Sequence, residues 1–99
     1  MDTGLAGKCA LVAGGSSGIG LAIAMELAKE GAHVAIGARD PDRLAAAERM
    51  VKEVASGQVH ATSVDLTDTD EARRWVDEVA TAEFGALHVV VGSGSSPPL

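Results

Sequence analysis

The chain has 99 residues, which suits one small domain, and its single cysteine excludes an intramolecular disulfide and a cysteine-based zinc framework. Its 14 acidic and 8 basic residues give a net charge of −6, which argues against nucleic-acid binding because a phosphate backbone needs a basic face. The chain has 46% hydrophobic residues and neither a secretory signal nor a run of ~20 apolar residues, so we expect a soluble, cytoplasmic protein without membrane partners.

Short apolar runs alternate with longer helical patterns, and glycine marks the changes between them. Residues 8–13 form a continuous apolar run that ends in a glycine loop, which predicts a buried strand. In residues 17–29 the side chains of Ile19, Ile23 and Leu27 stand four apart, with Ala22 and Ala24 between them, which predicts the apolar stripe of a helix. A glycine just beyond this segment is expected to end the helix.

The middle of the chain repeats this order of strand and helix. Residues 33–37 predict a second strand, and Asp40 before Pro41 predicts a helix start with the aspartate as N-cap. Apolar residues at helical spacing continue this helix, namely Leu44, Ala47, Val51 and Val54. Residues 59–64 then predict a third strand.

The last third of the chain predicts one more helix and one more strand. Thr67 with Asp70 three residues later resembles a capping box at the start of a helix. The apolar stripe of that helix is Ala72, Trp75, Val76 and Val79. Residues 87–91 predict a fourth strand, and 92–99 a loop because they are rich in Gly, Ser and Pro.

The resulting order, β-α-β-α-β-α-β, is typical of an α/β protein with a parallel sheet. In an open sheet of this class the ligand binds at the carboxyl ends of the strands. The segments to examine for a site are therefore those that follow Ala13, Gly37, Val64 and Val91.

The first of these segments is rich in glycine and lies between a strand and a helix. It reads Gly14-Gly15-Ser16-Ser17-Gly18-Ile19-Gly20. Glycines let the backbone approach a ligand closely, and the N-terminus of the following helix attracts phosphate. The two serines add hydroxyl donors. The pattern predicts a phosphate-binding loop, and the alternative is a tight turn that merely needs glycine.

A second motif overlaps the same loop. Gly14-x-Ser16-x-Gly18 fits the nucleophile elbow of serine hydrolases, and Asp65 and His88 follow in the required chain order. This alternative leaves the last glycine of the loop unexplained, and the strands and oxyanion loop that should precede the serine are missing.

Residues 12–20 resemble the cofactor loop of the short-chain dehydrogenase/reductase family, whose pattern is T-G-x-x-x-G-x-G, with Ala13 in place of the threonine. The resemblance extends over the whole chain, which corresponds to the N-terminal part of enzymes more than twice as long. It implies a Rossmann-type doubly wound parallel sheet of strand order 3-2-1-4, incomplete relative to the full fold. Residues 1–99 would then be one partial NAD(P)-binding domain, with 92–99 as a loop tail at the truncation point. The cofactor-binding residues that it implies in the loop are Gly14, Ser16, Ser17, Gly18, Ile19 and Gly20.

The end of the second strand bears on the choice of cofactor. In dinucleotide folds an acid about 20 residues beyond the glycines binds the ribose hydroxyls of NAD, whereas a nearby arginine accommodates the 2′-phosphate of NADP. By the family pattern Ala38 stands at the position of the acid and Arg39 follows it. We therefore expect NADP(H) to be favoured over NAD(H). The alternatives are a solvated loop charge for Arg39 and a helix cap for Asp40.

Two later segments complete the site that the resemblance implies. Asp65 and Leu66 resemble the family's step after strand three, which faces the adenine, and Asp65 has capping of the next helix as a compatible alternative. The family's Asn-Asn-Ala-Gly turn after strand four is replaced by a Gly-Ser-Gly-Ser run, in which Gly92 and Gly94 are the expected backbone contacts. The loss of both asparagines is expected to weaken cofactor binding. The Ser-Pro-Pro segment that follows resembles family members in which a proline pair follows this turn, many of which are 3-oxoacyl-carrier-protein reductases.

The proton donor of the resembled family is a tyrosine with a lysine four residues later, and this sequence has no tyrosine. The resemblance therefore implies the cofactor-binding segment of an oxidoreductase that interconverts carbonyl and alcohol groups, with 3-oxoacyl compounds as candidate substrates. Whether the chain is an enzyme stays open. The competing interpretations are a truncated, non-catalytic nucleotide-binding remnant and the serine hydrolase.

Two further expectations concern metals and self-association. His33, His60 and His88 lie at or near strand starts, opposite the ligand edge, so no metal site is expected from them. The last strand, which contains Val89 and Val90, would be an exposed apolar edge, so self-association is expected.

Overall fold

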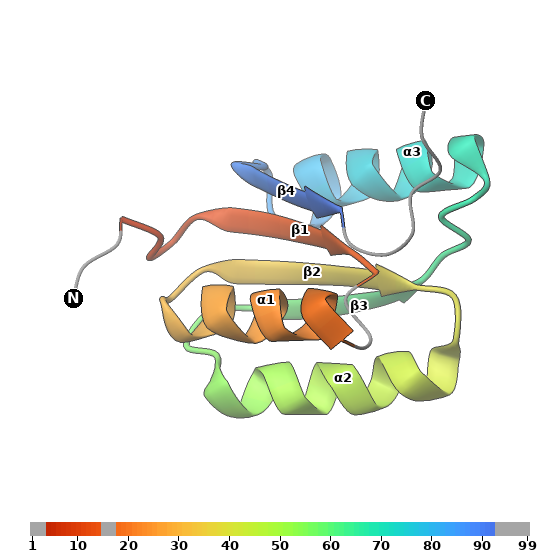
Figure 1. Ribbon diagram of the computed structural model, residues 1–99. Coiled ribbons are helices and arrows are strands. Elements are labelled where there is room, and N and C mark those ends of the chain that lie inside the picture. Colours follow the sequence, from red (N-terminus) through yellow and green to blue (C-terminus); the bar gives the residue numbers. More distant parts are fainter. Residues whose placement is uncertain (1–3, 15–17, 93–99) are drawn as a thin grey trace.

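Parallel strands form the centre of the molecule. The computed structural model describes residues 4–14 and 18–92, apart from the side chains of residues 82 and 83. Within these ranges β1 (Cys9–Ala13), β2 (His33–Ala38), β3 (Val59–Ser63) and β4 (Val89–Gly92) make one parallel sheet of order β3-β2-β1-β4 (Figure 1). The predicted α/β class and the predicted strand order 3-2-1-4 are confirmed.

Helices cover both faces of this sheet. α1 (Gly18–Lys29) and α2 (Pro41–Val54) lie on one face, and α3 (Thr69–Glu78) lies on the other and continues into a short π-helical turn, η1 (Val79–Glu83) (Figure 1). Because successive side chains of a strand point to opposite faces, β1 contributes Val12 to the core under α1 and α2, and Leu11 to the core under α3. The doubly wound arrangement therefore has two hydrophobic cores.

Local capping explains where the first two helices begin and end. The Asp40 carboxylate accepts the N–H groups of Asp42 and Arg43 at 3.0 and 3.4 Å, and Pro41 occupies the first helical turn, as predicted. At the end of α1, Gly31 has a φ of +90°, and its N–H donates to the carbonyl of Ala28. This left-handed residue ends the helix in the way that the glycine predicted.

The start of α3 differs from the prediction. The N-cap is Asp68, whose carboxylate accepts the N–H groups of Asp70 and Glu71 at 3.0 and 3.2 Å. Thr67 lies one residue too early to cap the helix, and its hydroxyl bonds to Asp65 instead. The predicted capping box was therefore wrong. Thr67 and Asp68 are neighbours that could both cap a helix, but only the Asp68 side chain reaches the N–H groups of the first turn of α3.

The buried face of α1 differs in part from the predicted stripe, of whose members Ala24 alone is fully buried. The residues that face the sheet are the small ones, Gly20, Ala24 and Ala28. Ile19, which was predicted to lead the apolar stripe, is 76% exposed. Small residues let the helix axis approach the sheet closely, so the larger side chains are displaced to the flank of the helix. There they line an open groove made by Leu5, Ile19, Ala22, Ile23 and Leu27, with Glu26 and Glu30 at its border.

β4 is the outer strand beside β1, and its bounds are shifted relative to the prediction. Gly92, expected in the loop tail, is its last residue and pairs in register with Ala13. Residues 93–99 lie outside the described residues. Val90 is 63% exposed on this strand, whereas Leu11, its partner in β1, is buried. Within the described ranges no helix combines the length and apolar character that a membrane span requires.

Candidate functional site

The carboxyl ends of all four strands meet at one edge of the sheet, as a parallel sheet requires. The register places Ala13 beside Gly37 on one side and beside Gly92 on the other. Ala38 in turn pairs with Ser63 at the end of β3. The points at which the segments singled out in the sequence begin therefore lie at one edge.

The glycine loop begins with a turn fixed by a hydrogen bond. Gly14 has a φ of +83°, and its N–H donates to the carbonyl oxygen of Gly37 at 2.8 Å. Gly18, the first residue of α1, has a φ of +60°, where L side chains are strained. The N-terminus of α1 thus follows on this loop (Figure 1), and the first N–H groups of a helix, which have no partner within the helix, favour an anion. Two predicted contacts, Ser16 and Ser17, lie outside the described residues.

The other residues that were predicted to bind the cofactor near the glycine loop differ in how exposed they are. Gly20 is buried against the sheet, so its role in the structure is close helix packing. Ile19 is 76% exposed beside the loop and is open to a ligand. Gly92 ends β4 next to Ala13 and has open space where a Cβ would stand. Gly94 lies outside the described residues.

At this edge, the need for a residue without a Cβ at position 37 was not predicted from the sequence. A Cβ at Gly37 would lie 2.6 Å from Cζ2 of Trp75 and 2.8 Å from Cζ3. The indole of Trp75 is 3% exposed and belongs to the core under α3. Since the two residues are far apart in the sequence, only the packing of α3 on β2 reveals that this position needs glycine.

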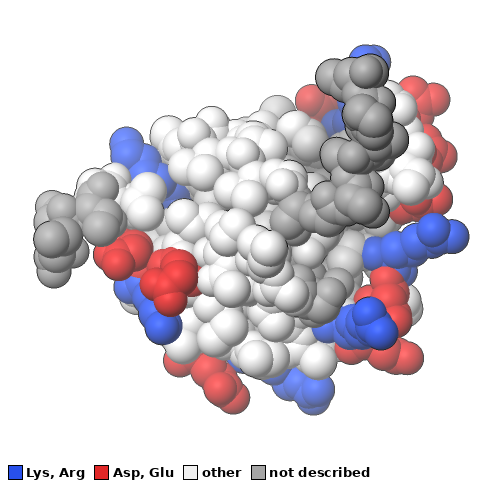
Figure 2. Space-filling view, viewed as in Figure 1, with Lys and Arg blue, Asp and Glu red and all other residues white. Residues whose placement is uncertain are grey.

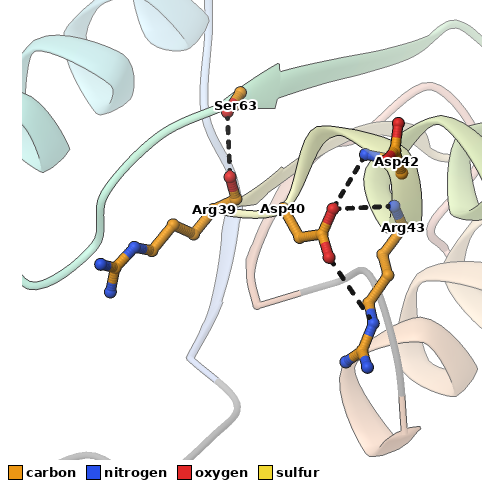
Figure 3. Close-up of polar contacts among 5 residues, drawn as sticks. All are labelled: Arg39, Asp40, Asp42, Arg43 and Ser63. Atoms are coloured by element: carbon orange, nitrogen blue, oxygen red, sulfur yellow. Dashed lines mark hydrogen bonds and ion pairs between the residues drawn. The ribbon is translucent and has the colours of Figure 1, made fainter.

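The backbone that carries Arg39 is held by two hydrogen bonds from the end of β3. The Ser63 hydroxyl donates to the carbonyl oxygen of Arg39 at 3.2 Å (Figure 3), and the N–H of Val64 donates to the carbonyl of Ala38 at 2.9 Å. The Arg39 side chain is exposed and points away from Asp40 in Figure 3. The cation is therefore presented to solvent from an anchored main chain.

Asp40 has a structural role. Besides capping α2, its carboxylate lies 3.8 Å from Nε of Arg43, an exposed ion pair on the first turn of the helix (Figure 3). The capping alternative for Asp40 is thus the one that the structure supports. Its negative charge is engaged by the helix and by Arg43, while Arg39 points elsewhere.

Asp65 lies half-buried just beyond the end of β3. Its Oδ1 accepts both the hydroxyl of Thr67 at 2.6 Å and the N–H of Thr67 at 3.0 Å. These two bonds lower the pKa of the Asp65 carboxyl below its ordinary value, and the positive charge of Arg39 lowers it further. Asp65 does not cap α3, a role that Asp68 takes. The adjacent Leu66 packs against the core under α3.

The three histidines lie at the opposite end of the sheet. Nδ1 of His88 accepts the N–H of Cys9 at 3.0 Å, and Nδ1 of His33 accepts that of Gln58 at 2.9 Å. His60 stacks edge-on to Phe84. Within the ranges that the structure describes, no three His, Cys, Asp or Glu side chains are grouped so that they could hold a metal ion. His88 and Asp65 are at opposite ends of their strands, which is incompatible with a catalytic triad of Asp65, His88 and Ser16.

Known proteins match nearly the whole chain in sequence. The profile of the short chain dehydrogenase family matches residues 8–96. Glycine betaine reductase ATRR of Emericella nidulans is 43% identical over 89 residues, which are 88% of this chain and 7% of that protein. Glucose 1-dehydrogenase of Gluconobacter oxydans is 40% identical over 86 residues, which are 87% of this chain and 32% of that protein.

Solved structures also resemble this chain over most of its length. L-sorbose reductase of Gluconobacter frateurii, complexed with NADPH and L-sorbose, superposes with a TM-score of 0.86 at 41% identity, over 97% of this chain and 36% of that one. NADH-dependent reductase A1-R′, complexed with NAD, superposes with a TM-score of 0.83 at 31% identity, over 97% of this chain and 39% of that one. The 99 residues therefore span no more than about a third of the curated relatives named above, and somewhat more of the two solved chains.

Proposed function

Since the chain belongs to the short-chain dehydrogenase/reductase family, we propose that residues 1–99 act as its nicotinamide-dinucleotide-binding segment and prefer NADP(H). The single observation that carries this proposal is the convergence of the Gly14 turn, the N-terminus of α1 and the Arg39 cation at one edge of the sheet. The chain would then be one partial domain of an oxidoreductase. A cytoplasmic location stays a prediction.

The residues at this edge fit the parts of the cofactor. The positive-φ turn at Gly14 and the first N–H groups of α1 would hold the pyrophosphate, with Ser16 and Ser17 as predicted hydroxyl donors. Asp65, ionised and half-buried, would accept the adenine amino group, and Leu66 would supply an apolar neighbour. Gly92 would leave room for the nicotinamide side because its backbone is open to approach. The cofactor, when bound, supplies or accepts a hydride.

The preference for NADP(H) is supported by charge at the end of β2. Ala38 is buried and carries no carboxylate that would bind ribose hydroxyls or repel a phosphate. Arg39 offers a planar guanidinium that can hold a 2′-phosphate with two hydrogen bonds. Asp40 is turned into the helix cap, so it does not neutralise the arginine.

The test is a pair of dissociation constants for this chain, measured by calorimetry with NADPH and with NADH at the same ionic strength. Tighter binding of NADPH is expected. Tighter binding of NADH would overturn the preference, and no binding of either cofactor would overturn the proposed function.

For the chemistry we propose that this chain binds the cofactor without turnover. Reduction of a carbonyl needs a proton donor near the substrate oxygen, and the sequence contains no tyrosine for the role that the family gives to one. Oxidation of NADPH in the presence of a 3-oxoacyl thioester, the candidate substrate class, is expected to stay at the background rate. A catalysed rate would make the chain an enzyme by itself.

The chain is also proposed to associate with itself through the β4 side of the molecule. Val90 is exposed on this outer strand, and the surface formed by Leu66 and one flank of α3 contains the apolar residues Ala72 and Val76 together with Thr69, Arg73 and Asp77. The opposite flank of α3, beside β3, carries Glu71, Arg74 and Glu78. Figure 2 shows few charged side chains over β4, β1 and α1, while Lys, Arg, Asp and Glu gather around the rim of this view. An unpaired apolar strand edge favours association.

A further inference from the structure

Thr67 is the residue whose predicted and observed roles differ most. Its hydroxyl was expected to cap α3, but Asp68 does this. Both donors of Thr67, the hydroxyl and the backbone N–H, instead converge on Oδ1 of Asp65, at 2.6 and 3.0 Å. Thr67 itself is exposed, so its hydroxyl contributes a hydrogen bond without being part of the core.

The convergence of two donors on one oxygen constrains the aspartate. A carboxylate with one oxygen held from two directions has its side-chain rotation fixed, and most of its remaining acceptor capacity lies on Oδ2. The same bonds favour the ionised form, which accepts but cannot donate hydrogen bonds. A turn reinforces this arrangement, because the N–H of Asp68 donates to the carbonyl of Asp65 at 3.1 Å.

We infer that Thr67 is a positioning residue that fixes Asp65 as an acceptor for the 6-amino group of a purine, and so makes the site selective for adenine over a 6-oxo purine. This inference rests on the proposed cofactor binding. A fixed, ionised acceptor attracts an amino group and repels a carbonyl oxygen at the same place, whereas a freely rotating aspartate can turn away from the carbonyl. Selectivity for adenine therefore depends on the fixed orientation of the Asp65 carboxylate as well as on its negative charge.

The experiment compares two cofactors that differ only at this atom, NADPH and its hypoxanthine analogue, with the full chain and three variants. In Thr67→Val the side-chain donor is lost, and in Thr67→Ser it is kept. Thr81→Val is the matched control, because Thr81 also donates a 2.6 Å hydrogen bond, but to the carbonyl of Asp77 within the α3–η1 segment. We expect Thr67→Val to lower the preference for NADPH over the analogue by about three- to tenfold. Thr67→Ser and Thr81→Val should keep the preference of the original chain.

A second readout does not depend on cofactor binding. The titration of the Asp65 carboxyl, followed by its side-chain ¹³C shift, should move upward in Thr67→Val and stay low in Thr67→Ser and Thr81→Val. If the original chain binds NADPH but Thr67→Val leaves both the preference and the titration unchanged, the role of Thr67 is overturned while the proposed function stands. If the original chain does not bind NADPH, the proposed function fails, and the titration still reports whether Thr67 holds Asp65.

Discussion

The indole ring of Trp75 covers Gly37 so closely that a methyl group at this glycine would overlap Cζ2 and Cζ3 of the ring. Gly37 is also the acceptor for the N–H of Gly14, so the same residue contacts the core helix on one side and the glycine loop on the other. The packing of α3 therefore helps to set the position of the loop at which the cofactor is proposed to bind.

Gly37→Ala is expected to destabilise the chain by about 1–3 kcal/mol, because the added methyl group forces Trp75 or β2 to move in a packed core. Denaturant unfolding followed by tryptophan fluorescence measures this loss. Gly92→Ala is the control, since that glycine is also in the sheet but has open space around a Cβ. Equal stability of the two variants would contradict the packing argument.

Arg39→Ala is expected to weaken NADPH binding about tenfold or more and to leave NADH binding nearly unchanged, because only NADPH carries the 2′-phosphate. Arg43→Ala serves as the control: its guanidinium is engaged with Asp40 at the start of α2. A similar loss of affinity for both cofactors in Arg39→Ala would indicate that Arg39 does not distinguish them. Both constants follow from calorimetric titration.

The lowered pKa of Asp65 predicts how the stability of the fold depends on pH. Because its pKa is lower in the folded chain than in the unfolded one, it stabilises the fold at pH values above its ordinary pKa of about 3.8. This stabilisation is lost as the pH falls through the lowered value. Asp65→Asn should therefore be less stable than the original chain at neutral pH, and the gap should narrow below about pH 4. Thermal unfolding of both proteins across this range tests it, and a gap independent of pH would contradict the assignment.

Val90→Lys tests the proposed self-association. A charge in the middle of the outer strand β4 should shift the chain toward the monomer, because edge lysines oppose strand pairing. Met50→Lys is the matched control, since Met50 is a 44% exposed apolar residue on α2, away from that strand. Sedimentation velocity distinguishes the species. A monodisperse monomer of the original chain would refute the proposal.

Much of the site was predictable because its residues act locally. Gly14 and Gly18 adopt positive φ values in a strand–loop–helix segment that is continuous in the sequence. Asp40 caps the helix that begins with the next residue. The residues that were misjudged depend on small differences in position: Thr67 and Asp68 are both suitable caps, and only the turn at Asp65 decides between them. The larger members of the predicted apolar stripe of α1 were misjudged because hydrophobicity does not reveal that small residues allow closer packing.

The sequence by itself determined the order of strands and helices, the glycine loop and the presence of an arginine after the second strand. These follow from periodicity, backbone freedom and charge, which are properties of neighbouring residues. The tertiary structure alone decided that Gly37 must be glycine and that Ser63 anchors the backbone of Arg39. Each of these contacts joins residues on different elements, so it exists only after the parallel sheet has aligned their ends and α3 has packed on it.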